Sequence, residues 1–388
     1  MGSVPGDGTG GGVRDALRAA VAELQLVDHH VHGAFHAPVT RARFEESINE
    51  GSPDPIPGWM TQFDSQLGFA IRRWCAPLLD LPEHAPADDY WARRAELGER
   101  EVAGRLLPAA GVSDWLVDTG YLGGDLLDPS GLAAVSGGRA HEIVRLEALA
   151  ESLAAGGISG AGYADAFRDL LRAAGRTAAG VKTVVAYRTG FDIDWTPPAP
   201  AEVTASADRW LSGAGPGPRL TDPTLLRFGI HSAVDLGLPI QIHVGYGDRD
   251  LDLHRADPML LLGLLRRPEV AAVPIMLLHC YPYHRQAGYL AQSFPNVHLD
   301  VGLVLNHMGA RATAVVAESL ELAPFAKVLY SSDACGPAEL HYLGARLWRH
   351  AITGIAGGWV SAGDWSAADA ERVITMIGRD NARRVYHL

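Results

Sequence analysis

Two histidines stand two positions apart at the end of the first apolar segment that could form a strand. They are His30 and His32, and Gly33 follows them. Side chains two residues apart on a strand point to the same face, so the two imidazoles can bind one cation. Taken alone, such a pair is more often a packing feature at a strand edge.

Four more polar residues lie in or at the ends of later apolar segments, namely Lys182, His243, His279 and Asp333. Imidazole and carboxylate groups are ligands that zinc, manganese and iron accept, and this set contains no thiolate. Each residue by itself also has an ordinary structural explanation, such as a helix cap, a hydrogen-bonded core residue or a salt-bridged lysine. A common function therefore depends on a fold that brings all of them to one place.

The order of the segments predicts such a fold. Almost continuously apolar strands alternate with helices of about three turns, which is typical of a parallel sheet covered by helices. We predict strands at 25–32, 115–118, 142–147, 181–187, 239–244, 274–279, 297–301 and 327–332. Eight such units indicate a (β/α)8 barrel of the TIM type, in which the carboxyl ends of the strands form one rim. Because all six polar residues lie in or near strands of this barrel, the sequence predicts a metal site at that rim.

The other segments are assigned around a single barrel domain at residues 13–388. Residues 1–12 are rich in glycine and lack the apolar core of a signal peptide, which predicts a flexible leader. Residues 34–110, after the first strand, are predicted to be a mostly helical insertion. Residues 190–220 are rich in proline and glycine, and they are predicted to form a long loop after the fourth strand, where a lid would lie.

The composition excludes several classes of protein. The 388 residues include 33 Lys and Arg against 45 Asp and Glu, a net charge of −12, whereas a nucleic-acid binder needs a basic face. Hydrophobic residues make up 47% of the chain, which excludes wholesale disorder, and no apolar run is long enough to span a membrane. Three scattered cysteines favour a reducing compartment over a disulfide framework. We therefore expect a cytoplasmic protein that acts on a small molecule and binds neither nucleic acid nor membrane.

These motifs resemble the amidohydrolase superfamily, and specifically its second amidohydrolase group, over nearly the whole chain. The Asp-His-His-Val-His run at 28–32 is similar to the superfamily's metal pair on strand one, and Lys182 in Gly-Val-Lys-Thr-Val-Val-Ala-Tyr is similar to its strand-four ligand. His243 and His279 resemble its histidines on strands five and six, and Asp333 resembles its aspartate on strand eight. The stretches at 278–285 and 328–333 are similar to the branch related to glutamine-synthetase-associated amidohydrolases.

The resemblance implies one or two divalent metal ions, zinc or else manganese or iron. In the superfamily, the strand-four lysine can carry a carbamate whose two oxygens bridge a pair of metals. With Lys182 carbamylated, the resemblance implies one metal held by His30, His32 and Asp333 and a second held by His243 and His279. With Lys182 free, it implies a single ion held by the first three residues and one further histidine.

The site set predicts metal-assisted hydrolysis of an amide or related C–N bond. A bound cation lowers the pKa of its water from about 15.7 toward about 7. Asp333 would orient that water, take its proton and pass the proton to the leaving amine. His243 or His279 would help to polarise the carbonyl group and to hold the developing negative charge.

Three further residues are candidates for contact with the substrate. Arg188 follows the fourth strand, Glu147 is placed with Arg145 on the third strand, and Tyr246 is expected to line a wall. A guanidinium group binds a carboxylate in a bidentate fork, which favours a γ-glutamyl amide or an N-acyl amino acid as substrate. For Arg188, a surface ion pair is an equally good explanation.

Two other functions remain open. One is a metal-dependent decarboxylase or C–C bond hydrolase that uses a single metal, and Lys182 argues mildly against it. The other is a non-catalytic binding or scaffold protein, which an intact ligand set makes the weakest of the three. Barrels of this kind often form homo-oligomers, and no interface stripe in the sequence decides the oligomeric state.

Overall fold

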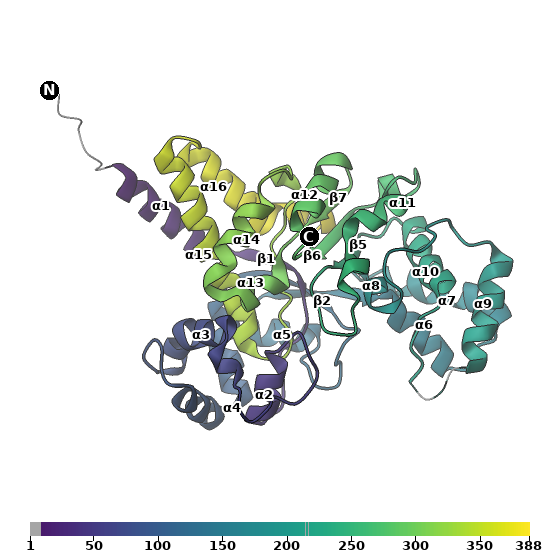
Figure 1. Cartoon of the computed structure of the whole chain (residues 1–388), viewed down its shortest axis with the longest axis horizontal. Helices are drawn as coiled ribbons and strands as arrows, with labels where there is room; N and C mark the ends of the chain where they lie inside the picture. Colours follow the sequence, from purple (N-terminus) through teal and green to yellow (C-terminus); the bar gives the residue numbers. More distant parts are fainter. Residues whose placement is uncertain (1–8, 214, 216) are drawn as a thin grey trace.

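The computed structural model describes residues 9–213, 215 and 217–388. Seven parallel strands form one sheet, in which every strand pairs with the next one along the chain. They are β1 (Leu26–Val31), β2 (Val112–Asp118), β3 (Arg139–Arg145), β4 (Gly180–Thr183), β5 (Ile240–Val244), β6 (Ile275–His279) and β7 (Val297–Leu299). Helices connect the strands and surround the curled sheet, which is the arrangement of an α/β barrel (Figure 1).

The segment predicted as the eighth strand does not form a regular strand. It makes one isolated bridge, between Val328 and Leu299 of β7. On its other side it meets β1, because the amide of His29 donates to the carbonyl of Tyr330. The ladder is interrupted where the amide of Ser332 donates to the side chain of Asp28 instead of to a backbone carbonyl. The segment therefore closes the gap between β7 and β1 without completing a regular eight-stranded sheet.

A small apolar cluster fills the inside of the barrel. It includes side chains from strands that are not neighbours in the sheet, which can touch only if the sheet curls around them. Tyr386, on the last helix, packs into this cluster. The cluster comprises Val27, Leu116, Ile143, Met276, Leu278 and Leu329, with Ala382, Val385 and Tyr386 from the C-terminal helix.

The helices pack their apolar faces against the outside of the sheet. Several begin at polar caps, for example α10, where the Asp222 carboxylate accepts from the amides of Thr224 and Leu225. The helices are α1 (Thr9–Glu23), α2 (Arg41–Ser47), α3 (Gln66–Ala70), α4 (Ala87–Ala109), α5 (Pro129–Ser136), α6 (Leu146–Ala155), α7 (Gly160–Ala174), α8 (Val185–Arg188), α9 (Pro200–Gly213), α10 (Pro223–Asp235), α11 (Leu262–Leu265), α12 (His284–Ser293), α13 (Gly302–Met308), α14 (Ala312–Ser319), α15 (Ala338–Ala362), α16 (Ala367–Thr375) and α17 (Asn381–Tyr386).

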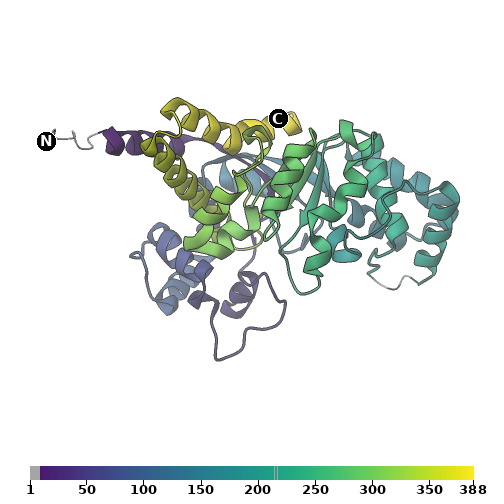
Figure 2. The same cartoon turned by 45° about the horizontal axis from the view of Figure 1, so that its top comes forward.

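The segments around the barrel differ in part from their predicted form. Most of the predicted leader at 1–12 lies outside the described residues, and α1 begins at Thr9. Helices α2, α3 and α4 occupy the stretch between β1 and β2, drawn in purple and blue at the lower left of Figure 2. Helix α9 lies within the predicted loop at 190–220. Its first residue is Pro200, and proline is compatible with the first turn of a helix, so the prolines before it did not exclude a helix here.

The predicted ends of the third and fourth strands are also too late, and this changes the position of two candidate substrate contacts. The fourth strand stops at Thr183, and Arg188 belongs to the short helix α8. The third strand stops at Arg145, and Glu147 lies in the first turn of α6, where a carboxylate is favoured by the helix dipole. No helix among the described residues is long and apolar enough to cross a membrane.

Candidate metal centre

The carboxylate of Asp333 lies between three histidines. Its Oδ1 is 2.9 Å from Nε2 of His30 and 3.7 Å from Nε2 of His32. Its Oδ2 is 3.4 Å from Nε2 of His279. Residues from β1, from the end of β6 and from the segment that closes the barrel thus converge at one rim, as the parallel arrangement of the strands requires.

The other two predicted ligands adjoin this group. Nζ of Lys182, on β4, is 2.8 Å from Nε2 of His30. The ring of His243, on β5, has its centroid 4.6 Å from that of His279. The structure therefore brings all six residues of the predicted metal set together.

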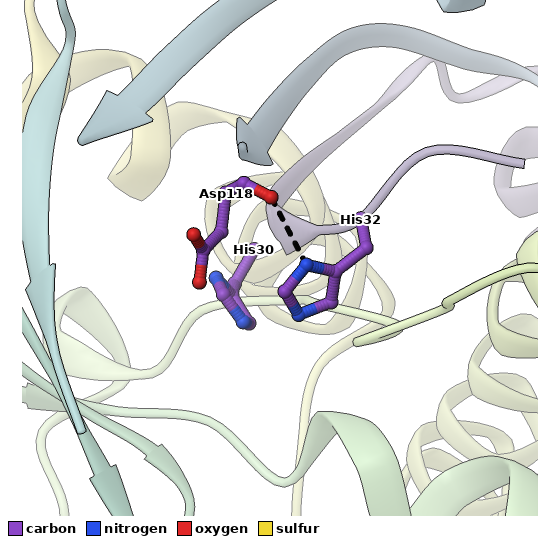
Figure 3. Close-up of side chains that lie close together, drawn as sticks. All are labelled: His30, His32 and Asp118. Atoms are coloured by element: carbon purple, nitrogen blue, oxygen red, sulfur yellow. Dashed lines mark hydrogen bonds between the residues drawn. The ribbon is translucent and has the colours of Figure 1, made fainter. Parts of the chain in front are cut away.

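Asp118 is a member of the site that sequence reasoning missed. It is the last residue of β2, and its Oδ2 lies 3.4 Å from Nζ of Lys182 and 2.6 Å from Nη2 of Arg145. Its side chain also lies beside His30 and His32, and these three residues offer ligand atoms within 4.8 Å of one another (Figure 3). The sequence contained a signal for this residue, because Asp118 is the last residue of a predicted strand, as His32 and His279 are of theirs.

Burial sets the charge of the site. It lowers the pKa of His32 to about 3, and it holds the pKa values of His30, His243 and His279 well below their ordinary value. The histidines are therefore neutral at pH 7, which is the form that binds a metal.

The charged side chains of the site respond to burial in different ways. Burial lowers the pKa of Lys182 and raises that of Asp333. Burial would also raise the pKa of Asp118, but the charges of Arg145 and Lys182 outweigh it and hold this pKa well below its ordinary value. Asp118 is therefore an ionised carboxylate beside neutral imidazoles.

The hydrogen bonds of the histidines leave ligand atoms unused. Nδ1 of His32 lies 3.0 Å from the backbone carbonyl of Asp118, so Nδ1 carries the proton and Nε2 keeps its lone pair (Figure 3). Both ring nitrogens of His279 and Nε2 of His243 are buried without a hydrogen-bond partner among the described residues. Buried polar atoms normally have partners, so these nitrogens fit a ligand, either a divalent cation held with the nearby carboxylates or a polar group of a substrate.

The backbone at the site is strained. His279 and Asp333 have positive φ angles of 67° and 49°, which residues other than glycine rarely adopt. The carboxylate of Asp300 holds the first of them, because its Oδ1 accepts from the amide of His279 at 3.0 Å. Its Oδ2 lies 3.0 Å from Nε2 of His29, which joins this support to β1.

A cavity of about 220 Å³ opens onto the centre. Arg188 lines it, as do Lys182, His243 and Asp333. Two of the predicted substrate-binding residues do not line it. Glu147 is buried behind the strand ends, where its Oε1 accepts from the hydroxyl of Thr183 and the amide of Val184. Tyr246 instead packs against the rings of Tyr281 and His307.

Comparison with known proteins assigns the family. A family model described as Amidohydrolase matches residues 130–388, which is more than half of the chain. The chain belongs to the amidohydrolase family. This amidohydrolase is thus an enzyme of the metal-dependent hydrolase class, and the buried histidines and carboxylates are its candidates for binding a divalent metal.

Individual proteins are similar to all or part of this chain. The amidohydrolase is 34% identical to Protein fluG of Emericella nidulans over 223 residues, which cover 54% of this chain and 25% of that protein. It is 28% identical to a protein from Lactobacillus casei ATCC 334 whose crystal structure has the provisional description of metal-dependent hydrolase, with a TM-score of 0.83 over 96% of this chain and 97% of the other. An uronate isomerase from Bacillus halodurans shares the fold at 14% identity, with a TM-score of 0.63 over 98% of both chains.

Proposed function

We propose that this amidohydrolase cleaves an amide or related C–N bond in a small substrate that carries a carboxylate. The observation that supports the proposal is the convergence of His30, His32, His279 and Asp333 beside a cavity that also contains Arg188. Within this class, a γ-glutamyl amide or an N-acyl amino acid is the substrate proposed.

The residues that would hold the metal are those whose ligand atoms lie within 4.8 Å of one another, in two groups that share His30. One group adds His32 and Asp118, and the other adds His279 and Asp333. Nitrogen and oxygen ligands without thiolate favour zinc, or else manganese or iron. When bound, the metal supplies a Lewis acid that makes water reactive at neutral pH.

Lys182 is the residue that decides between one metal and two. Burial lowers its pKa, which favours the neutral amine, the form that reacts with carbon dioxide to give a carbamate. In the free form, its ammonium group instead pairs with Asp118 at 3.4 Å. Electron density beyond Nζ, together with the number of metal ions per chain, distinguishes these forms.

Three side chains would act directly on the substrate. The carboxylate of Asp333 would accept the proton of the attacking water and return it to the leaving nitrogen. Nε2 of His243, buried in the cavity wall, would contact the carbonyl oxygen as negative charge develops there. The guanidinium group of Arg188 would bind the substrate carboxylate.

The two predicted substrate contacts that lie outside the cavity have indirect roles in this proposal. Glu147 would position Lys182, because its carboxylate accepts from the hydroxyl of Thr183 and the backbone amide of Val184, the two residues that follow that lysine. Tyr246 would support the wall of the site through its packing against Tyr281.

Elemental analysis of the purified protein, combined with assays on γ-glutamyl amides and N-acyl amino acids, tests the proposal. We expect bound divalent metal, release of free amine from at least one amide, and loss of this activity on chelation that is restored by metal. Release of carbon dioxide from a carboxylic acid, without amide cleavage, would favour the decarboxylase alternative. Replacement of Arg188 by Met is expected to raise KM for the carboxylate-bearing amide by about tenfold or more, with a smaller effect on kcat.

A further inference from the structure

The cavity wall contains acidic side chains that the proposed chemistry does not use. Glu50 lies after helix α2, and Asp248 lies after strand β5. Both line the cavity together with Asp333 and Arg188. Neither carboxylate forms an ion pair with a lysine or arginine within the part of the chain that the structure describes.

The basic side chains of the same cavity, by contrast, are already paired. Arg145 binds Asp118 at 2.6 Å, and Arg188 binds Glu151 at 3.0 Å. Arg219 lies 3.9 Å from Asp250. The cavity-lining Asp, Glu, Lys and Arg side chains that lack an ion-pair partner in the described part of the chain are therefore the acidic Glu50 and Asp248, although four basic side chains line the cavity.

Arg188 nevertheless keeps capacity for a ligand. Its side chain is only 10% exposed, and it makes a single ion pair. Its Nε is buried without a hydrogen-bond partner among the described residues. Nε2 of His243, in a residue that is 4% exposed, is also unpartnered and also lines the cavity. Buried polar atoms in a cavity wall indicate a polar ligand, independently of the acidic residues.

The backbone places the basic and acidic sides next to each other. The hydroxyl of Tyr187, the residue before Arg188, accepts from the amide of Asp248 at 3.3 Å. The loop after β5 is also tied to the loop after α2, because Arg249 forms an ion pair with Asp54, with Nη2 2.9 Å from Oδ1. Asp248 directly precedes Arg249, and Glu50 lies four residues before Asp54, so these ties hold the loops that bring both carboxylates to the cavity that Arg188 also lines.

We propose that the cavity binds substrates that carry a carboxylate and a protonated amine together, with Arg188 on the carboxylate and Glu50 and Asp248 on the amine. This inference rests on the proposed function for the position of the bond that is cleaved. It selects between the two substrate types considered above, because a γ-glutamyl amide has a free α-amine and an N-acyl amino acid has none.

The electrostatics of Glu50 agree with a cationic ligand group. Burial raises the pKa of Glu50 to about 8, and the charges of Asp333 and Asp248 act in the same direction. A cation between Glu50 and Asp248 would oppose both effects and stabilise the ionised carboxylates.

Binding of three small molecules to the purified full chain tests the proposal without requiring turnover. L-Glutamate has both groups, glutarate lacks the amine, and 4-aminobutyrate lacks the α-carboxylate. In isothermal titration calorimetry we expect L-glutamate to bind at least about tenfold more tightly than either of the others. Equal binding of glutarate and L-glutamate, or no binding of any of the three, would overturn the proposal.

Single substitutions assign the two halves of the site. Glu50→Gln and Asp248→Asn are each expected to reduce the preference for L-glutamate over glutarate, and Arg188→Met to reduce the preference over 4-aminobutyrate. Glu46→Gln is the matched control, because Glu46 lies on α2 and does not line the cavity. Circular dichroism and the melting temperature check that each variant folds. If both acidic variants fold and keep the full preference over glutarate, the amine assignment is wrong, whether or not an amide is hydrolysed.

Discussion

Strand β2 carries one aspartate near its amino end and another at its carboxyl end, and their surroundings differ. Asp114 has fixed partners, with Arg139 at 2.6 Å, His141 at 3.1 Å and the hydroxyl of Ser113 at 2.8 Å. Asp118 also forms ion pairs, with Arg145 at 2.6 Å and Lys182 at 3.4 Å, but it lies in addition beside His30 and His32, and the ligand atoms of these three residues lie within 4.8 Å of one another. The side chains at the amino end of this strand thus stabilise the fold, and those at its carboxyl end include candidate metal ligands.

The same contrast extends around the barrel. Near the amino ends of β1 and β2, the buried guanidinium group of Arg349 donates to four backbone carbonyls, those of Val21, Leu24, Ala110 and Gly111. At the carboxyl ends, His279 and His243 have buried nitrogens without hydrogen-bond partners among the described residues. Since burial of an unpartnered polar group costs free energy, we attribute these nitrogens to the binding of a ligand at the carboxyl ends.

The largest effect is expected at the carboxyl end, from Asp333→Asn. The amide keeps the shape of the side chain but cannot accept the proton of the attacking water. We expect turnover to fall by about 10²–10⁴-fold while the melting temperature changes little. Metal content must be measured beside activity, and Asp369→Asn, which changes an exposed carboxylate, is the control. Near-normal turnover in a metal-loaded Asp333→Asn protein would remove the proton-transfer role.

A substitution near the amino ends of the strands should lower stability and leave turnover unchanged. Arg349→Met leaves four buried carbonyls without their donor, so we expect the free energy of unfolding to fall by about 3 kcal/mol. Urea denaturation measures this loss, and turnover per folded molecule should be unchanged. Arg372→Met removes only an exposed ion pair with Asp369 and should cost less than about 0.5 kcal/mol. Equal stability of the two variants would contradict the division between the ends of the barrel.

Asp118→Asn tests whether the missed residue belongs to the metal set. The substitution removes a negative charge beside His30, His32 and Lys182, so we expect the affinity for the metal to fall by about 10–100-fold. Competition with a chromogenic chelator measures this affinity. Unchanged metal binding would assign Asp118 to the ion pairs with Arg145 and Lys182 alone.

The smallest effect concerns acid stability at the amino end. Burial acts to raise the pKa of Asp114, but hydrogen bonds from His141 and Ser113 and the charge of Arg139 outweigh it and hold this pKa below its ordinary value of 3.8. Because the folded state lowers this pKa, its stabilising effect is fully present above pH 3.8 and is lost as the pH falls further. The difference in stability between the native chain and Asp114→Asn should therefore be constant above about pH 5 and shrink below about pH 4. A difference that does not change with pH would contradict this account.

The barrel could be predicted from the sequence, because the pattern that indicates it lies in short segments of the chain. Apolar strands alternate with helices, and the rule for parallel strands then places His30, His243 and His279 at one rim. The same rule would have found Asp118. The prediction of strands was less reliable for the last segment. Its apolar run at 328–330 is typical of a strand, but the amide of Ser332 donates to the side chain of Asp28 and not to a neighbouring strand.

Other features depend on the path of the chain in three dimensions. Glu50 and Asp248 lie in loops without any periodic pattern, and their common cavity follows only from how two distant loops are tied together. The sequence places Glu147 on the third strand and predicts that it contacts the substrate, yet it lies in the first turn of α6, where its carboxylate accepts from the amide of Val184. The positions of these three side chains can be predicted only when the path of the loops and turns that precede them is known.

Crystals of the purified protein, measured with X-rays above and below the absorption edge of the metal found by elemental analysis, test the central claim most directly. We predict an anomalous difference peak within bonding distance of His30 and Asp333, which disappears in a His30→Ala, Asp333→Ala double variant. A peak only at other residues, or none after soaking with zinc, manganese and iron, would contradict it.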